Sequence, residues 1–578
     1  MGNGRMMVYG HGPEILQVLA DPISADSFCT VTLPDVHECR RERVPATAIW
    51  RFLLQNGVTI TDCIDPGSNA FVRKIEGQNE LRMVLFVDPV YVPDGRVSED
   101  GVFRFSAENG VRFLIYHVDC VPKRVFSVSG GITVKRENGN RYELRFTGGT
   151  GYLFIADEER SVFSAKQTSD EKRMDRVRRY WQRFLSGMRP FPEWLRTPAE
   201  EVAVMIKSQQ ADDGAVIAGY VYHLGYVRDQ YGVARSYLAM GFVREAMEIM
   251  RFFREYYDKY GVIHNAQSVS YHGVFHVHEN DHVEITGYLA DLAFRIYEAT
   301  GDRAFFRETL PLIQWCIESQ KQEVKHGMLP FNGDETYIAG GLLPRSVMYD
   351  GSAEATLLFA ENLRAYKTHT GDPSYDKTEK EVCRQYLSHF VDGTHYYAND
   401  PARMRPEAYP HRRYGVCENC RGVFGILEKT ENDRYVCDRC RSLDPLPKRS
   451  FGKVELASVK LMPAYLGSQM LPDELGARIV NDTARMFCET GTLPSGCADG
   501  YAVGYDPGML LYALSKAKHP AAKTVFERTM ALRDETGVWS EYYLNGAPAG
   551  SRCRAWESGI SMEAIIVYFE NMIPIDMK

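Results

Sequence analysis

The side chains best suited to chemistry are two carboxylates set among aromatic residues. Glu335 follows Phe331 in a glycine-containing loop, and Glu541 lies between Trp539 and Tyr542. A carboxyl group that is desolvated by aromatic rings has a raised pKa and can act as a general acid, whereas an ionised carboxylate can act as a general base. The simpler interpretation of each residue is a solvated turn or an exposed surface glutamate.

Two further loops combine acids with other polar groups at the start of helix-like segments. Arg228 and Asp229 follow Tyr226 in HLGYVRDQYG, and Asn280 and Asp281 lie in HVHENDHV. A guanidinium group donates hydrogen bonds to sugar hydroxyls and a carboxylate accepts them, so an Arg–Asp pair beside an aromatic ring suits a sugar. Each aspartate could instead cap its helix. The histidines of HVHENDH do not have the HExxH spacing of a metal site.

Four cysteines interrupt the helical pattern in YGVCENCRGVFGILEKTENDRYVCDRCRSL. Cys417 and Cys420 form one CxxC pair, Cys437 and Cys440 form another, and 16 residues separate the pairs. Two such pairs can supply four thiolates to one Zn²⁺ in a closed tetrahedron, which predicts a structural zinc site. Two redox dithiols are the alternative interpretation.

The elements that must position these groups change in character near residue 165. Residues 1–165 contain short runs rich in Val, Ile, Phe, Tyr and Thr, and ENGNRYELRF has the pattern of a hairpin. We therefore expect an N-terminal antiparallel β-sandwich over 1–165. A charged amphipathic segment at 169–187 predicts a linker helix within 166–191.

From about residue 192 the apolar residues recur at helical spacing in about a dozen segments, and the loops between them often begin with Gly. Twelve helices in hairpins can close as six inner and six outer helices. The expected fold class is therefore multi-domain α+β, with an (α/α)6 toroid over 192–578 and a zinc-ribbon-like insert at 412–445. An open solenoid is the alternative, but no fixed repeat period is evident.

Composition restricts the function classes. The 578 residues carry a net charge of −8, which disfavours a nucleic-acid-binding surface. No run of about 18 apolar residues occurs, so we expect no membrane span. The first 28 residues lack the apolar core of a secretory signal, and the 13 cysteines fit free thiols and metal ligands. We expect a cytoplasmic protein.

Taken in order, four segments between residues 195 and 578 resemble a glucoamylase-type (α/α)6 glycosidase of glycoside hydrolase family 15. They are YVRDQYGVARSYLAMG, HENDHVEITGYLADLAFRIYEATGD, GDETYIAGGLLPRSVMYDGSAEATLLFAENLRAY and GVWSEYY…RAWESGI. The chain departs from the family pattern at Val227, which replaces a proline, and at Gly333 and Asp334, where a tryptophan is usual. Tyr542 stands where glutamine is common, and the cysteine insert lies outside the pattern.

The resemblance implies roles for individual residues. Glu335 would be the general acid and Glu541 the general base of an inverting hydrolysis, with about 6.5–9.5 Å between the two carboxyl groups. The expected substrate is an oligosaccharide, with an α-glucoside cleaved from a chain end. The expected substrate-binding residues, several of them placed by the aromatic character of their loops, are Tyr226, Arg228, Asp229, Asn280, Asp281, Trp539 and Trp556.

Three other functions stay open from the sequence. A glycoside phosphorylase would use phosphate on the same barrel and would not need Glu541 as a base. A non-catalytic sugar-binding or scaffold protein would use the zinc insert for docking, and a homodimer is compatible with that insert. A polysaccharide lyase would act on a uronate through Tyr, His and Arg chemistry.

Overall fold

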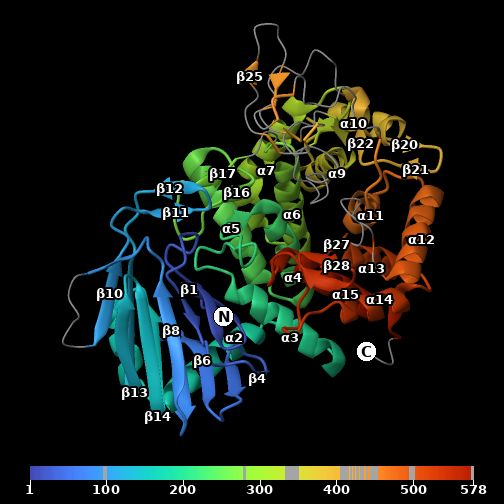
Figure 1. Cartoon of the computed structure of the whole chain (residues 1–578). Helices are drawn as coiled ribbons and strands as arrows, with labels where there is room; N and C mark the ends of the chain where they lie inside the picture. The colour runs from blue at the N-terminus through green and yellow to red at the C-terminus, as the bar shows by residue number, and fades with distance from the viewer. Residues whose placement is uncertain are drawn as a thin grey trace. The chain divides into compact units, whose positions relative to one another are not determined.

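The computed structural model covers the whole chain. It describes all residues except 95–100, 278–280, 332–349, 404–414, 417–418, 421–422, 425–427, 430–434, 438–439, 443–452, 492, 494–500 and 575–578. Glu335, Asn280 and Cys417 therefore lie outside the described residues. The chain divides into two compact units (Figure 1). The first contains residues 1–226, 240–252 and 267–275, and the second contains 227–239, 253–266 and 276–578.

The first unit is built on antiparallel strands, as the sequence predicts. In its described part, twelve of them join into one hydrogen-bonded sheet, whose main path runs β1-β2-β3-β8-β14-β7-β6-β5-β4, with β13, β10 and β9 attached through β14. The strands of this unit are β1 (Met6–His11), β2 (Glu14–Ala20), β3 (Cys29–Thr32), β4 (Cys39–Arg43), β5 (Trp50–Leu54), β6 (Thr59–Asp65), β7 (Ala70–Gly77), β8 (Leu81–Val87), β9 (Val92–Pro93), β10 (Val102–Ser106), β11 (Val111–Phe113), β12 (Tyr116–Val118), β13 (Lys123–Asn138) and β14 (Arg141–Ala156).

The long hairpin β13–β14 links the two halves of this sheet. Asn138 pairs with Arg141 across a two-residue turn, which confirms the predicted hairpin. The first part of β14 pairs with β8 and the last part, from Gly149, pairs with β7. Gly148 and Gly149 between these parts have φ values of 109° and 82°, which side chains with a Cβ rarely adopt. The glycine pair therefore lets one strand serve both halves.

Three helices follow the sheet: α1 (Glu159–Gln167), α2 (Asp170–Leu185) and α3 (Glu193–Ser208). The predicted helix at 169–187 is confirmed as α2. Its N-cap is Ser169, whose hydroxyl accepts the Lys172 N–H at 3.4 Å. Arg173 is buried beneath the first turn and donates to Asp170 at 2.7 Å and to the carbonyl of Ala165 at 2.7 Å. These contacts fix α2 to the end of α1.

The second unit is mainly helical, and its helices are of two kinds. α6 (Glu284–Thr300), α9 (Ala353–Thr370), α13 (Asp506–Lys516) and α15 (Ala555–Met572) are buried over most of their length, whereas α7 (Arg303–Glu323), α10 (Asp376–Phe390), α12 (Asp473–Thr490) and α14 (Ala522–Ala531) bury one face. A helix buried all round lies inside a core, and an amphipathic one covers it. The contacts agree, because α6 packs on α7 and α9, and α13 packs on α14 and α15.

The remaining elements are short, or contain residues of both units, as α4 (Val227–Met240) and α5 (Val243–Tyr260) do. The others are α11 (Ala457–Leu466), the 3-10 helix η1 (Pro401–Arg403), β15 (Gly225–Tyr226), β16 (Ala266–Gln267), β17 (Phe275–His276), β18 (Leu329–Pro330), β19 (Gly351–Ser352), β20 (Val391–Asp392), β21 (His395–Tyr396), β22 (Asn399–Asp400), β23 (Gly415–Val416), β24 (Val423–Phe424), β25 (Glu428–Lys429), β26 (Tyr435–Val436), β27 (Tyr501–Val503), β28 (Tyr542–Leu544) and β29 (Ala547–Ala549).

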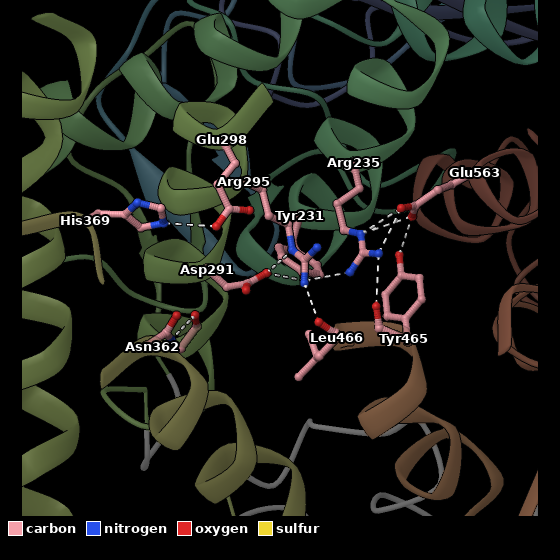
Figure 2. Close-up of polar contacts among 11 residues, drawn as sticks. Tyr231, Arg235, Asp291, Arg295, Glu298, Asn362, His369, Tyr465, Leu466 and Glu563 are labelled. Carbon is pink, nitrogen blue, oxygen red and sulfur yellow. Dashed lines mark hydrogen bonds and ion pairs between the residues drawn. The ribbon is translucent and has the colours of Figure 1, made fainter. Parts of the chain in front are cut away.

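A buried polar network ties four of the helices together (Figure 2). Arg235 of α4 donates to Glu563 of α15 at 2.8 Å, and its guanidinium lies 3.6 Å from the ring centre of Tyr465 of α11. Tyr465 also donates to Glu563 at 2.8 Å. Arg235 donates to Tyr231 at 3.0 Å, and Tyr231 donates to Asp291 of α6 at 2.5 Å. Each buried charge is therefore paired, which a low-dielectric interior requires.

Among the described residues, no helix is long and apolar enough to cross a membrane.

Candidate active site at the helix N-termini

Buried charges of the second unit gather at the N-terminal ends of its central helices. Arg228 and Asp229 open α4, Glu284 opens α6, and Glu354 lies in the first turn of α9. All of these side chains are buried. With three residues near the start of α15 and one at the start of α13, the group contains six acids and two cations. They are Asp229, Glu284, Glu354, Asp506, Glu541 and Glu557, with Arg228 and Arg554.

Arg228 organises one side of this group. Its guanidinium donates to Glu284 at 3.1 Å. Glu354 accepts the hydroxyl hydrogen of Tyr288. Burial raises the pKa of Glu354 to about 7, although the Tyr288 hydrogen bond and the charge of Arg228 lower it. A carboxyl group with this pKa exchanges its proton near neutral pH.

Arg554 organises the other side. It lies 2.9 Å from Asp229 and donates to Glu557 at 3.1 Å. Burial raises the pKa of Glu557 to about 7, Arg554 lowers it, and the carboxylates of Asp229 and Glu541 raise it further. Because Asp229 and Glu557 both pair with Arg554, and the carboxylates of Asp229 and Glu541 raise the pKa of Glu557, the titration of Glu557 depends on its acidic neighbours.

Glu541 is held by backbone groups next to these ion pairs. It is 3% exposed, and its Oε2 accepts the Ser551 N–H at 2.8 Å. Its carbonyl oxygen accepts the Gly504 N–H at 2.9 Å, beside the sheet β27–β28–β29. Gly550 has a φ of 69°, and a Cβ there would lie 2.9 Å from Oε2. The turn at Gly550 therefore fixes one oxygen of Glu541.

Trp556 forms an aromatic wall next to the acids. The side chain is 2% exposed, and its ring centre lies 5.4 Å from that of Tyr505 and 6.3 Å from that of Tyr288. Trp539 is also buried, but its Nε1 donates to the carbonyl of Thr529 at 2.9 Å, at the end of α14. Trp539 is therefore hydrogen-bonded to α14, whereas Trp556 packs against Tyr505 and Tyr288.

The remaining predicted residues have different surroundings. Asp281 is buried and lies 3.0 Å from His264 Nδ1, whereas the N-cap of α6 is Val283, so Asp281 does not cap that helix. Tyr226 is partly buried in the first unit, with its ring 6.1 Å from that of Tyr222. Asn280 lies outside the described residues.

Glu335 also lies outside the described residues, but both flanks of its segment are described. Pro330 pairs with Gly351, and the Phe331 N–H donates to the Asp350 carbonyl at 3.1 Å. Ser352 then caps α9 by accepting the Ala355 N–H at 3.0 Å. Phe331 and Asp350, which flank residues 332–349, therefore lie close to the start of α9.

Sequence reasoning missed four of these buried charges: Glu284, Glu354, Asp506 and Arg554. Asp506 is fully buried, and neither carboxylate oxygen has a hydrogen-bond partner among the described residues. Burial raises its pKa to about 8. The local sequence gives only a partial signal, because each missed acid lies at the start of a helix whose next residues are mostly apolar, as in VEITGYLADLA and YDPGMLLYAL.

Three cysteines of the predicted metal site meet in the structure. The sulfur atoms of Cys420, Cys437 and Cys440 all lie within 4.8 Å of one another. Three converging thiols can hold a metal ion. Cys417, the fourth predicted ligand, lies outside the described residues.

Comparisons with known proteins agree with this architecture. A scan against protein-family models and a search of curated proteins found no match. Among solved structures, a bacterial glucoamylase complexed with acarbose matches 99% of this chain and 92% of its own, with a TM-score of 0.63 and 11% identity. A structure named as a kojibiose phosphorylase from the human microbiome matches 96% of this chain and 81% of its own, with a TM-score of 0.52 and 10% identity. The chain therefore has the fold of glucoamylase-like six-hairpin glycosidases.

Proposed function

We propose that the chain is an inverting glycoside hydrolase that cleaves an α-glucoside from the end of an oligosaccharide, in a site at the centre of an (α/α)6 toroid. The observation that carries the proposal is Glu541, a buried carboxylate fixed by the Ser551 N–H beside the ion pairs of Arg228 and Arg554. The glucoamylase-like fold supports it.

In the proposed reaction, protonated Glu335 gives its proton to the leaving oxygen. Ionised Glu541 takes a proton from a water molecule, which attacks the opposite face of the anomeric carbon. Inversion requires about 6.5–9.5 Å between the two carboxyl groups, so that the water fits between them. Arg228 and Asp229 would donate to and accept from hydroxyls of the terminal sugar, Asn280 and Asp281 would extend this contact, and Trp556 would form a wall.

Phosphorolysis is the second candidate, because a structure named as a phosphorylase shares the fold. Among the described residues, the two buried guanidinium groups of the site are already paired with carboxylates, Arg228 with Glu284 and Arg554 with Asp229 and Glu557, so a phosphate dianion would compete with these acids. Like charges at short range in a buried site are strongly unfavourable. Water carries no charge, so the electrostatics of the site favour hydrolysis.

Replacing Glu541 with Gln tests the proposal, because an amide keeps the shape but cannot act as a base. We expect kcat on a cleaved oligosaccharide to fall by about 10²–10⁴-fold while the sugar still binds. The matched control is Glu171→Gln, since Glu171 is exposed on α2. Unchanged turnover in Glu541→Gln would remove the general base from the account, and absence of turnover in the native chain would favour a sugar-binding protein.

We also propose that Cys417, Cys420, Cys437 and Cys440 bind one structural Zn²⁺. The meeting of three of these sulfur atoms supports this assignment. Four thiolates would fill the tetrahedral sphere of the ion and leave no position for substrate, so the zinc would stabilise the insert and take no part in catalysis.

A further inference from the structure

A cleft lies within the first unit, and none of the described acids of the candidate active site lines it. It measures about 540 Å³ and is lined by residues of β10, the start of β13, the residues leading into α1, and Arg5 and Asp21. This volume falls within the usual range of small-molecule sites, about 300–1,000 Å³. All of its lining residues belong to the first unit, so that unit alone forms the cleft.

The charges that line the cleft cancel. Five lining side chains are basic and five are acidic. Several pair with each other: Arg5 donates to Asp21 at 3.2 Å, and Arg104 donates to Glu159 at 2.7 Å. An anion would meet the carboxylates and a cation would meet the basic groups. A hydroxyl group both donates and accepts, so it can bond to both members of an ion pair.

One wall of the cleft is fixed by backbone contacts. Arg124 is 2% exposed and donates to the carbonyls of Ala20 at 3.0 Å, Asp21 at 3.1 Å and Lys123 at 2.8 Å. Asp157 Oδ1 has no hydrogen-bond partner among the described residues, so the lining keeps a spare acceptor. A lining that is ordered before binding reduces the entropy lost when a ligand binds.

Two of the lining side chains are partly exposed. The side chains of Arg5 and Asp21 are 35% and 36% exposed, so both can bond to a ligand without unfolding their surroundings. Burial of the rest of Asp21 raises its pKa, and the Arg5 hydrogen bond lowers it. A ligand hydroxyl could therefore accept from the guanidinium and donate to the carboxylate at one place.

We propose that this cleft is a second saccharide-binding site that holds a neutral oligosaccharide through its hydroxyl groups. The neutral, polyhydroxylated class follows from the balanced lining, and the choice of a saccharide within that class rests on the proposed function. A holding site on the same chain raises the local concentration of substrate near the catalytic unit.

Titration calorimetry of the full chain carrying Glu541→Gln tests this proposal, with maltoheptaose, cellopentaose and mannopentaose as probes. We expect two binding sites per chain for at least one probe. Adding Arg5→Gln or Asp21→Asn should weaken one site at least tenfold and leave the other unchanged. Asp35→Asn is the matched control, because Asp35 lines a smaller cleft of about 200 Å³ in the same unit; both sites should survive it.

One binding site for every probe, or two sites that Arg5→Gln and Asp21→Asn leave unchanged, would overturn the proposal. Inorganic phosphate is added as a competitor for the site that Arg5→Gln weakens. Displacement of the sugar from that site by phosphate would also overturn the proposal, since it would identify an anion site. In the chain with Glu541 intact, Arg5→Gln should not alter turnover of a disaccharide. Turnover with a single binding site contradicts only this proposal, and two sites without turnover contradict only the proposed hydrolysis.

Discussion

At the scale of single residues, the candidate site is defined by buried carboxyl groups, which outnumber the buried guanidinium groups Arg228 and Arg554 among the described residues of the site. Asp506 is the extreme case, because it is fully buried and burial raises its pKa to about 8. A pKa that is higher in the folded chain than in the unfolded chain makes the free energy of unfolding depend on pH. Between about pH 4 and pH 8, the unfolded chain has lost this proton and the folded chain still holds it.

We therefore predict that Asp506 makes the free energy of unfolding fall as pH rises from about 4 to about 8. Asp506→Asn removes this titration, so the variant should gain stability relative to the native chain as pH rises. The gain between pH 5 and pH 8 should exceed about tenfold in the unfolding equilibrium constant. Denaturant unfolding at several pH values measures it.

The control for this measurement is Asp392→Asn, because Asp392 is exposed. Its stability should follow the pH dependence of the native chain. An Asp506→Asn curve parallel to the native curve would show that Asp506 ionises at its ordinary pKa and would contradict the buried, protonated state.

Single residues also show the limit of sequence reasoning. Arg228, Asp229 and Glu541 could be proposed because charged groups beside aromatic rings in a loop suit a sugar, although a helix cap or a surface residue was the simpler interpretation. Glu284 and Glu354 follow a hydrophobic pattern instead, and an acid in the first turn of a helix is normally explained by the helix dipole. Their burial depends on several helices converging, which no local pattern contains.

At the scale of elements, close helix contacts position the aromatic wall. Gly232 of α4 faces Trp556 of α15, and a Cβ at Gly232 would lie 2.6 Å from the indole ring. We predict that Gly232→Ala destabilises the fold by about 1–3 kcal/mol, because overpacking forces the helices apart or the ring out of place. Thermal unfolding measures the loss, and kcat should fall with it.

Gly476 of α12 is the matched control for this prediction. A Cβ there would meet nothing within 4 Å. Gly476→Ala should therefore stabilise the helix, by about 0.5–1 kcal/mol, because alanine loses less conformational entropy. Equal effects of the two substitutions would show that backbone entropy, and not the Trp556 contact, governs Gly232.

The cysteine insert makes a separate prediction at this scale. The native chain should bind one Zn²⁺ with high affinity, measured by metal analysis after dialysis. Cys437→Ser should lose the ion and lower the melting temperature, because a buried ligand of the cluster is removed. Cys488→Ser is the control, since Cys488 lies outside the cluster. Zinc retained by Cys437→Ser at full stoichiometry would contradict the site.

Individual helices and hairpins could be predicted more readily than their long-range partners. The hairpin β13–β14, the helix α2 and the glycine that ends α6 follow from local signals, namely turn residues, helical periodicity and Gly301 in the left-handed region. The pairing of one strand with both β7 and β8 could not be predicted, because it depends on long-range partners of β14.

At the scale of the whole molecule, the order of four weak motifs on a helical chain was enough to predict the fold. The glucoamylase structure matches nearly the whole chain at 11% identity, so the architecture is shared although few residues are. The buried acids at the helix N-termini are the feature that this architecture brings together. The domain boundaries at 165 and 191 and the toroidal closure stay predictions.

The most direct test of the account is the anomeric form of the first product. The native chain is incubated with a panel of α- and β-linked oligosaccharides, with and without phosphate, and the released sugar is followed by proton NMR before mutarotation. We predict release of a free β-anomer from an α-linked substrate, at a rate that phosphate does not change. An α-anomer, a sugar phosphate, or absence of turnover on every α-linked substrate would contradict inverting hydrolysis by Glu335 and Glu541.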